Sequence, residues 1–418
     1  MTSPTATNPS EPRAYDVVVF GATGFVGRLL AAYLAEHAPE GARIALAGRS
    51  LERLTEVRDG LPSTASGWPL VVADVGDTEA LAELARSTTA LATTVGPYAR
   101  YGLPVAIACA QAGTHYADLT GEVLYVRDVI DACHDTAEQT GAKLVTSCGF
   151  DSVPSDLGVH LLHRYAQDHQ LGGLGDTTLL VTRMKGGFSG GTIDSMRAQL
   201  DAIQADPSRR KTVFDPFALS PDRATEHEPD RERDVYRVYR DQRTEQWTGP
   251  FVMAPFNTRI VRRSNALLGH AYGSRFRYRE AMAFGTDLGA YAKATALTSA
   301  IGAGMAAMSS SVTRPLVDRL APKPGDGPDE KAREEGRFRM EVRTVTDKGR
   351  GLLAIVAAKG DPGYAATAVM LGESALSLAF DGGRLPEGGG VLTPATAMGD
   401  ALVDRLKAQD FTLDVGPD

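Results

Sequence analysis

DVVVFGATGFVGRLLAAYL, residues 16–34, sets the architecture of the chain. The apolar, β-branched run Val17–Phe20 is typical of a buried parallel strand, and the apolar residues after the glycines fall on one helix face. Strand, glycine turn and helix in this order predict a dinucleotide site, with phosphates on the free N–H groups of the helix N-terminus. The alternative is an α/β protein with an empty glycine turn. The residues expected to hold the cofactor here are Gly21, Ala22, Thr23, Gly24, Phe25, Val26 and Gly27.

Each of the three glycines has its own expected role. Gly21 permits the tight turn, Gly24 lets a pyrophosphate approach the backbone, and Gly27 lets the helix pack close to the strand. The spacing is GxxGxxG rather than GxGxxG, which is similar to the spacing in NADP-dependent reductases and extended short-chain dehydrogenases.

The end of the second predicted strand, residues 43–47, distinguishes NAD from NADP. NAD enzymes usually place an acid here, which accepts a hydrogen bond from the ribose 2′-hydroxyl. This chain has Arg49 and Ser50 instead, and a guanidinium beside a hydroxyl suits a 2′-phosphate. We therefore expect NADP as the cofactor. The alternative is that Arg49 is only a solvated charge at the end of the strand.

Further predicted strands bring small and polar residues to one edge of the sheet. Strands are expected at 69–73, 90–95 and 143–147, and six strands that alternate with helices predict a doubly wound parallel sheet. Ligands of such sheets bind outside the carboxyl ends of the strands. Asp74, at the end of the third strand, either faces the adenine or, equally, caps a helix or stabilises a turn. The residues expected along this groove are Asp74, Val75, Thr94, Val95, Gly96 and Pro97.

Acids of the later strands fall on the same edge. Asp118 and Glu122 follow a strand near residue 115 and are the better candidates for a role at the site, whereas His115 itself is expected to be structural. A helix is predicted at 105–112, after Pro104, and another at about 124–140.

Composition bounds the class of protein. The 418 residues allow two or three domains, and a net charge of −8 argues against general nucleic-acid binding. Three scattered cysteines have no metal-ligand spacing, so no metal site is expected, and they fit a reducing cytoplasm. The predicted division is a disordered tail at 1–13, an NADP-binding Rossmann domain at 14–150, a substrate domain at 151–390 and a C-terminal helix at 391–418 that returns to the Rossmann domain.

The middle of the chain loses the alternation of strand and helix. Strands are expected at 179–184, 341–346 and 352–357, which suits an α+β domain with a mostly antiparallel sheet. A second glycine-rich turn at 186–192 precedes a helix, and it is equally consistent with an anion site and a flexible connection. Residues 206–235 and 322–336 are rich in charge and predict exposed loops.

Residues 294–313 carry no charge. Leu297, Ile301, Met305, Met308 and Val312 fall at helix spacing, but the segment is too weakly apolar for a membrane span. A surface helix that touches a lipid substrate, or a membrane peripherally, is one interpretation. The other is a helix packed on its own domain or on a second subunit of a homodimer.

Several short stretches point to a known family. They are Val95–Tyr98 with Tyr101-Gly102, Gly113–Glu122, Gly149–Asp156, Gly360–Tyr364 and Gly390–Ala395. They resemble the saccharopine dehydrogenase-like reductases, and within them the trans-acting enoyl reductases of polyketide lipid assembly, over nearly the whole chain from Tyr15. The resemblance implies reduction of a carbon–carbon double bond in a lipid chain held by a polyketide synthase, in phthiocerol or phenolic glycolipid synthesis.

The chemistry requires a proton donor on the cofactor edge. Tyr98, Tyr101 and Asp151 are the candidate catalytic residues, and no tyrosine has a lysine four positions later as short-chain dehydrogenases do. Three functions stay open. They are an NADPH-dependent enoyl reductase of lipid or polyketide intermediates, a saccharopine-type amino-acid dehydrogenase, and a nucleotide-binding scaffold associated with lipid that performs no turnover.

Overall fold

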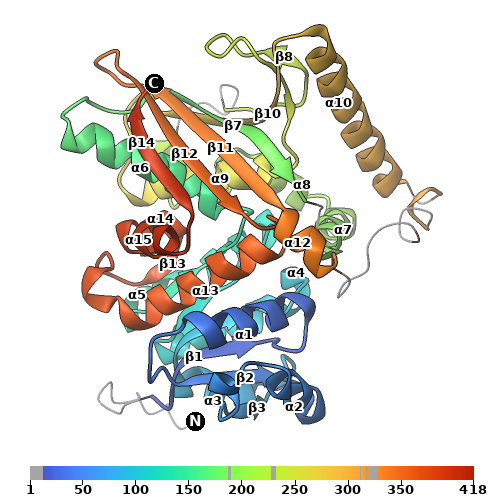
Figure 1. The fold of residues 1–418 in the computed structure, drawn as a ribbon, viewed down its shortest axis with the longest axis vertical. Helices are drawn as coiled ribbons and strands as arrows, with labels where there is room; N and C mark the ends of the chain where they lie inside the picture. Colours follow the sequence, from blue (N-terminus) through green and yellow to red (C-terminus); the bar gives the residue numbers. More distant parts are fainter. Residues whose placement is uncertain (1–12, 187–189, 227–231, 311, 316–318, 320–326) are drawn as a thin grey trace.

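The computed structural model describes residues 13–186, 190–226, 232–310, 312–315, 319 and 327–418, and it contains two large sheets (Figure 1). The first sheet has the order β13-β6-β5-β4-β1-β2-β3, and all its described pairings are parallel. The predicted doubly wound sheet is confirmed, with β13 as a seventh strand. Its strands are β1 (Tyr15–Phe20), β2 (Ile44–Gly48), β3 (Leu70–Val72), β4 (Thr88–Thr93), β5 (His115–Ala117), β6 (Lys143–Val145) and β13 (Gly390–Leu392).

Alternating side chains of the central strand β1 supply the two faces of this sheet. Val17 and Val19 are fully buried in one hydrophobic core, and Val18 and Phe20 lie in the other. The first core is covered by α1 (Phe25–His37) and α13 (Ala365–Phe380), and the second by α3 (Thr78–Ser87), α4 (Tyr98–Ala112) and α5 (Val123–Thr140). Helix α2 (Leu51–Asp59) packs against β2 and β3.

The second sheet has the order β14-β12-β11-β7-β10-β9-β8. Among its described pairs only β7 and β10 run parallel, so the predicted mostly antiparallel sheet is confirmed. Helices α6 (Val153–Asp168) and α9 (Ala254–Leu267) pack against it. The strands are β7 (Asp176–Lys185), β8 (Tyr239–Arg240), β9 (Trp247–Pro250), β10 (Arg277–Gly285), β11 (Arg337–Val345), β12 (Gly351–Lys359) and β14 (Thr412–Pro417).

The start of α4 differs from the prediction. The helix begins at Tyr98 rather than at residue 105, and Pro104 lies inside it. The Glu122 carboxylate accepts hydrogen bonds from the backbone N–H groups of Tyr98 (3.0 Å) and Ala99 (2.8 Å), which fixes the earlier start. Pro104 then costs the helix one backbone hydrogen bond without ending it.

The described residues of the segment 206–235 are more structured than a charged exposed loop. They contain α8 (Arg209–Phe214), and two of their acids, Glu232 and Asp234, have almost fully buried side chains. Arg259 and Arg262 of α9 pair with them, at 2.7 Å to Asp234 and 3.2 Å to Glu232. A buried acid needs such a partner, and the partners are supplied by a helix distant in sequence. In the segment 322–336, residues 322–326 lie outside the described residues, and Glu330–Glu335 forms the short helix α12 rather than a loop.

The end of the chain also departs from a simple returning helix. The strand β13 joins the first sheet beside β6, and α14 (Pro394–Ala397) and α15 (Asp400–Ala408) follow. The last strand, β14, then pairs with β12 of the second sheet. The end of the chain therefore connects the two sheets. The sequence did not indicate this, because strands of only three and six residues give little periodic signal.

The uncharged segment lies mostly in α10 (Leu288–Ser309), which projects from the end of the second sheet at β9 and β10 (Figure 1). No helix within the described residues is both apolar and long enough to cross a bilayer.

Candidate active site

The glycine turn between β1 and α1 has the geometry that a dinucleotide requires. Gly21 has φ +87°, and a Cβ there would lie 2.8 Å from Val95 Cγ2. At Gly27 an added Cβ would lie 2.2 Å from the backbone oxygen of Gly21, so only glycine lets α1 approach β1 this closely. Gly24 is the N-cap of α1 and provides no side-chain cap, which leaves the first-turn N–H groups available to an anion. The residues present therefore fit a pyrophosphate.

The end of β2 offers a cation for the far end of such a cofactor. The Arg49 side chain is 80% exposed, and its Nε lies 3.9 Å from Asp74 Oδ2. An ion pair this exposed holds the guanidinium only weakly, so a phosphate could replace the carboxylate. Ser50 caps α2 by accepting a hydrogen bond from the Arg53 N–H at 3.3 Å, and its own hydroxyl hydrogen remains to donate. The Asp74 carboxylate accepts a hydrogen bond from the Gly76 N–H at 2.8 Å, as expected of a residue that stabilises the turn after β3.

The role of the Arg49 guanidinium can be tested by substitution. Arg49→Ala should lower the affinity for NADPH by about tenfold, because a charge-assisted pair to the 2′-phosphate is lost, and should leave NADH binding unchanged. Titration by nicotinamide fluorescence measures both constants. Arg58→Ala removes a cation of α2, the helix that follows Arg49; Arg58 pairs with Asp59 instead, and its loss should change neither constant. Equal NADPH affinity in wild type and Arg49→Ala would contradict the assignment.

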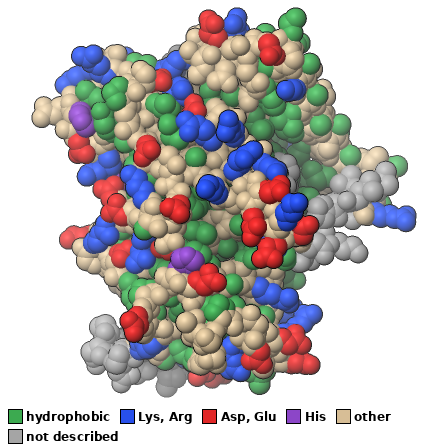
Figure 2. All heavy atoms as spheres, viewed as in Figure 1, with side chains coloured by type: hydrophobic (Ala, Val, Ile, Leu, Met, Phe, Trp, Pro, Cys, Tyr) green, Lys and Arg blue, Asp and Glu red, His purple; other side chains and the backbone are tan. Residues whose placement is uncertain are grey.

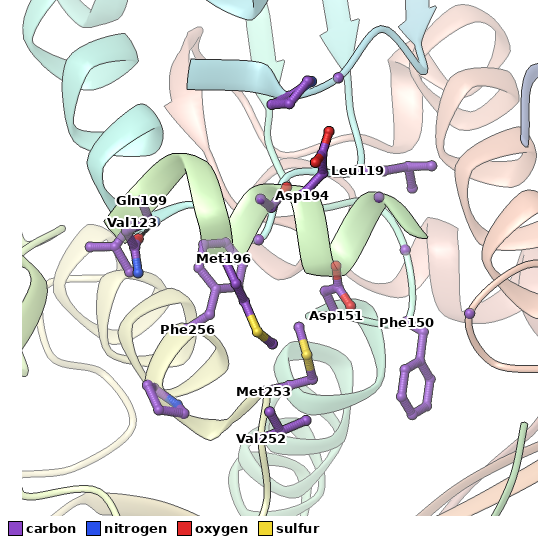
Figure 3. A pocket seen from close by; sticks show the side chains of 18 of the residues that line it. Leu119, Val123, Phe150, Asp151, Asp194, Met196, Gln199, Val252, Met253 and Phe256 are labelled. Carbon is purple, nitrogen blue, oxygen red and sulfur yellow. Dashed lines mark hydrogen bonds between the residues drawn. The ribbon is translucent and has the colours of Figure 1, made fainter. Parts of the chain in front are cut away.

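One cavity of about 730 Å³ connects the glycine turn with the second sheet and α10. Figure 3 shows part of its lining around Asp151 and α7. Gly24, Phe25 and Val26 border it at the first sheet, together with the β4 edge residues Thr94, Gly96 and Pro97. Thr94 also donates a hydrogen bond to the Gly21 oxygen at 3.1 Å, which ties the end of β4 to the turn. Most other lining side chains are apolar, and no Lys, Arg or His occurs among the described residues that line it.

Asp151 stands out among the lining residues. The turn that holds it is fixed by hydrogen bonds from the Ser152 and Val153 N–H groups to the Gly149 oxygen (3.2 and 2.9 Å) and from the Phe150 N–H to Thr367 Oγ1 (3.0 Å). Among the described residues its carboxyl has no hydrogen-bond or ion-pair partner, and burial raises its pKa to about 7. Figure 3 shows it beside Met253, across from α7 (Gly190–Ala205). A carboxyl with a pKa near neutrality in an apolar cavity can hold and release a proton.

The two candidate tyrosines are placed differently. Tyr98 borders the cavity, but its buried hydroxyl donates to the Thr93 oxygen at 3.0 Å and accepts from the Leu119 N–H at 3.1 Å. Burial, followed by the charge of Asp118, raises the pKa of Tyr98 well above its usual value. Tyr101 is 39% exposed and is not among the described lining residues.

Replacing Tyr98 tests whether its role is structural. Tyr98→Phe leaves the Leu119 N–H and the Thr93 oxygen without this partner, which should cost about 1–3 kcal/mol of unfolding free energy. We expect kcat to stay at the wild-type value, because the hydroxyl is directed at backbone atoms. Denaturant unfolding and steady-state kinetics on the same preparation separate the two effects, and a large loss of kcat at unchanged stability would restore Tyr98 as the donor.

Asp118 and Glu122 serve the scaffold. Asp118 is fully buried and accepts from the Tyr116 hydroxyl (2.8 Å) and from the N–H groups of Thr120 and Ser147, and burial raises its pKa to about 6. Glu122 caps α4 and accepts from the Ser195 hydroxyl at 2.7 Å. His115 accepts from the Lys143 N–H in its described contact, as expected of a structural residue.

Several lining residues could not be identified from the sequence. Helix α7 contributes Asp194, Ser195, Met196 and Gln199, and the loop between β9 and α9 contributes Met253. The glycine-rich turn at 186–192 gave a partial signal for α7, although residues 187–189 lie outside the described residues. The apolar residues gave none, since Met and Phe at helical spacing are equally typical of a packed core.

Comparison with known proteins identifies the cofactor domain. Residues 17–145 match the saccharopine dehydrogenase NADP binding domain, which supports NADP as the cofactor of the glycine turn. The fold resembles apo saccharopine dehydrogenase (L-Glu forming) from Saccharomyces cerevisiae, with a TM-score of 0.54 and 12% identity over 96% of this chain and 99% of that one.

The relatives extend over nearly the full length. The trans-acting enoyl reductase of Mycobacterium ulcerans is 47% identical and that of Mycobacterium tuberculosis 46%, over 95% and 96% of this chain and 96% and 97% of theirs. A second Mycobacterium tuberculosis protein, whose name gives the same activity provisionally, is 49% identical over 96% of this chain and 97% of its own. This chain belongs to the trans-acting enoyl reductase family.

Proposed function

We propose that the protein is an NADPH-dependent enoyl reductase that acts on a lipid or polyketide intermediate. The observation that supports this best is the Asp151 carboxyl, which is held without a described partner in an apolar cavity bordered by the glycine turn. Saturating a carbon–carbon double bond requires a hydride on one carbon and a proton on the other. Bound NADPH would supply the hydride.

The residues proposed to hold the cofactor are those of the glycine turn, Arg49 and Ser50 at the ribose end, and Asp74, Val75 and the β4 edge. Asp151 is the proposed proton donor. Its proton would pass to the substrate carbon next to the thioester carbonyl, and solvent would then reprotonate the carboxylate. The apolar side chains around it limit its contact with water, which keeps the pKa of the carboxyl raised.

The composition of the cavity disfavours a saccharopine-type substrate. An amino-dicarboxylate needs cationic side chains to bind its carboxylates. The described lining offers two carboxylates of its own, Asp151 and Asp194, and no cation. A nucleotide-binding scaffold without turnover is the remaining alternative, and kinetics decides between it and the enzyme.

The test is oxidation of NADPH by crotonyl-pantetheine, followed by nicotinamide absorbance. We expect turnover with NADPH, slower turnover with NADH, and no reduction of NADP+ when saccharopine is offered with the oxidised cofactor. NADPH that binds tightly but is not oxidised by enoyl thioesters of any length would support the scaffold instead.

Partners and location are further parts of the proposal. A carrier-bound substrate would make a polyketide synthase the natural partner, and three free buried cysteines fit a reducing cytoplasm. The exposed outer side of α10 supports peripheral contact with a membrane or pairing with a second copy. Vesicle co-sedimentation and the mass of the protein in solution test these two contacts.

A further inference from the structure

Helix α10 is apolar yet largely uncovered. Its first residue is Leu288, which is 84% exposed, and its contacts with β9 and β10 bury only Ala290 and Ala294 among its described side chains. Beyond Lys293 the helix carries no charge through Ser309. In Figure 2 hydrophobic side chains gather along this helix and in the hollow beside it. An apolar helix left in water is unfavourable unless another apolar group covers it.

One side of α10 faces the cavity described above. Thr298, Ile301, Gly302 and Met305 all border it, at the i, i+3, i+4 and i+7 positions of a single helix face. We call these four residues the α10 stripe. The cavity that they border is the one that contains the glycine turn and Asp151, so the stripe is continuous with the proposed reaction site.

The remaining walls of this part of the cavity are also apolar. They come from α7, α8, the loop before β8, the loop before α9 and α9 itself, and Figure 3 shows Met196 and Met253 directed toward one another between these elements. Methionine side chains adapt to irregular apolar partners. The apolar side chains of these walls include those of Met196, Val213, Val235, Val252, Met253 and Phe256.

We infer that the α10 stripe binds the alkyl chain of the substrate and that Ile301 and Met305 set the enzyme's preference for long chains. This inference rests on the proposed function, because it takes the reacting double bond to lie near Asp151. A chain that extends from there can follow the stripe, and each methylene that it buries should strengthen binding roughly fourfold. Short acyl groups would not reach the stripe and would lose this contribution.

The test compares crotonyl-pantetheine with dodecenoyl-pantetheine. In the wild-type protein KM should be lower for the longer chain by on the order of tenfold or more. Ile301→Trp fills the stripe and should raise KM for the long substrate on the order of tenfold, with KM for the crotonyl thioester unchanged. Met305→Gln, at a side chain that is 43% exposed and therefore tolerant of substitution, should act in the same direction.

Ala300→Trp is the matched control. Ala300 precedes Ile301 in the sequence, is exposed, and lies on the side of α10 away from the α10 stripe. It should leave both KM values unchanged. Calorimetric binding of the saturated dodecanoyl-pantetheine gives a readout that needs no turnover, and Ile301→Trp should weaken it while NADPH affinity stays constant.

The outcomes separate the two proposals. If neither thioester oxidises NADPH, enoyl reduction is refuted, and binding of the saturated thioester still decides whether the stripe is a chain site. If Ile301→Trp changes both chain lengths equally, changes neither, or is matched by Ala300→Trp, the stripe does not bind the chain.

Discussion

Asp151→Asn is expected to lower kcat by about 10²–10⁴-fold, the usual contribution of a positioned proton donor. Asparagine preserves the size of the side chain but cannot deliver a proton. Because the Asp151 carboxyl has no described hydrogen-bond partner, the substitution should break no contact of the scaffold. Stopped-flow measurement of NADPH oxidation by an enoyl thioester gives the chemical step directly.

The pH dependence gives the same residue a second signature. A donor with a pKa of about 7 is protonated below that pH and loses its proton above it. Wild-type kcat should therefore be level at acidic pH and fall about tenfold per pH unit above 7, and Asp151→Asn should lack this descent. A wild-type profile that stays flat to alkaline pH would exclude Asp151 as the acid.

Stability provides the internal check on this interpretation. The pKa of Asp151 is raised on folding, from 3.8 to about 7, so its favourable contribution is present at low pH and is lost as the pH rises through 7. Asp151→Asn removes this loss, and the variant should be at least as stable as wild type at pH 8. Reduced activity in a protein of undiminished stability then points to chemistry.

Asp194→Asn is the control for charge in the cavity. Asp194 borders the same cavity, but its carboxylate lies 3.4 Å from Arg197 on the next turn of α7. Because Asp194 is engaged with Arg197 and Asp151 has no described partner, we expect the loss of the Asp194 carboxylate to change kcat far less. Equal effects of the two substitutions would mean that the cavity needs negative charge in general and no specific donor.

The first sheet was predictable because its signals are local. Val17–Phe20, the glycine turn and the helix after it lie within 19 residues, and the next five strands of the sheet repeat the same local alternation with helices. Arg49 and Asp151 were predicted as site residues in the same way, since each follows a predicted strand and the fold class brings those ends together.

What escaped prediction depends on contacts between distant segments. The early start of α4 is set by Glu122, and the local signal of Pro104 pointed to a later start. The cavity joins Met196, Met253 and Ile301 from separate segments that share no motif. The lack of charge at 294–313 was visible, but only the packing of α10 on β9 and β10 determines which face borders the cavity.

Gly27→Ala and Gly24→Ala should separate the two tasks of the glycine turn. At Gly27 the new Cβ would lie 2.2 Å from the Gly21 oxygen and 2.9 Å from the Ala22 Cα, and neither backbone atom can move without displacing α1 from β1. Overpacking of this kind should cost about 3 kcal/mol or more of unfolding free energy. We expect a lower Tm in the absence of cofactor and little NADPH binding.

At Gly24 the same methyl group meets only the Gly21 oxygen, at 3.4 Å, and φ is −73°, so alanine fits the backbone. Gly24→Ala should therefore keep the wild-type Tm without cofactor. Its methyl group would occupy the space through which a pyrophosphate approaches the first turn of α1, and NADPH affinity should fall on the order of tenfold or more.

Thermal unfolding and fluorescence titration give a Tm and an NADPH affinity for each of the two glycine variants. If Gly24→Ala binds NADPH like wild type, the phosphates do not lie along this turn, whereas unaltered stability in Gly27→Ala would show that α1 and β1 can separate at no cost.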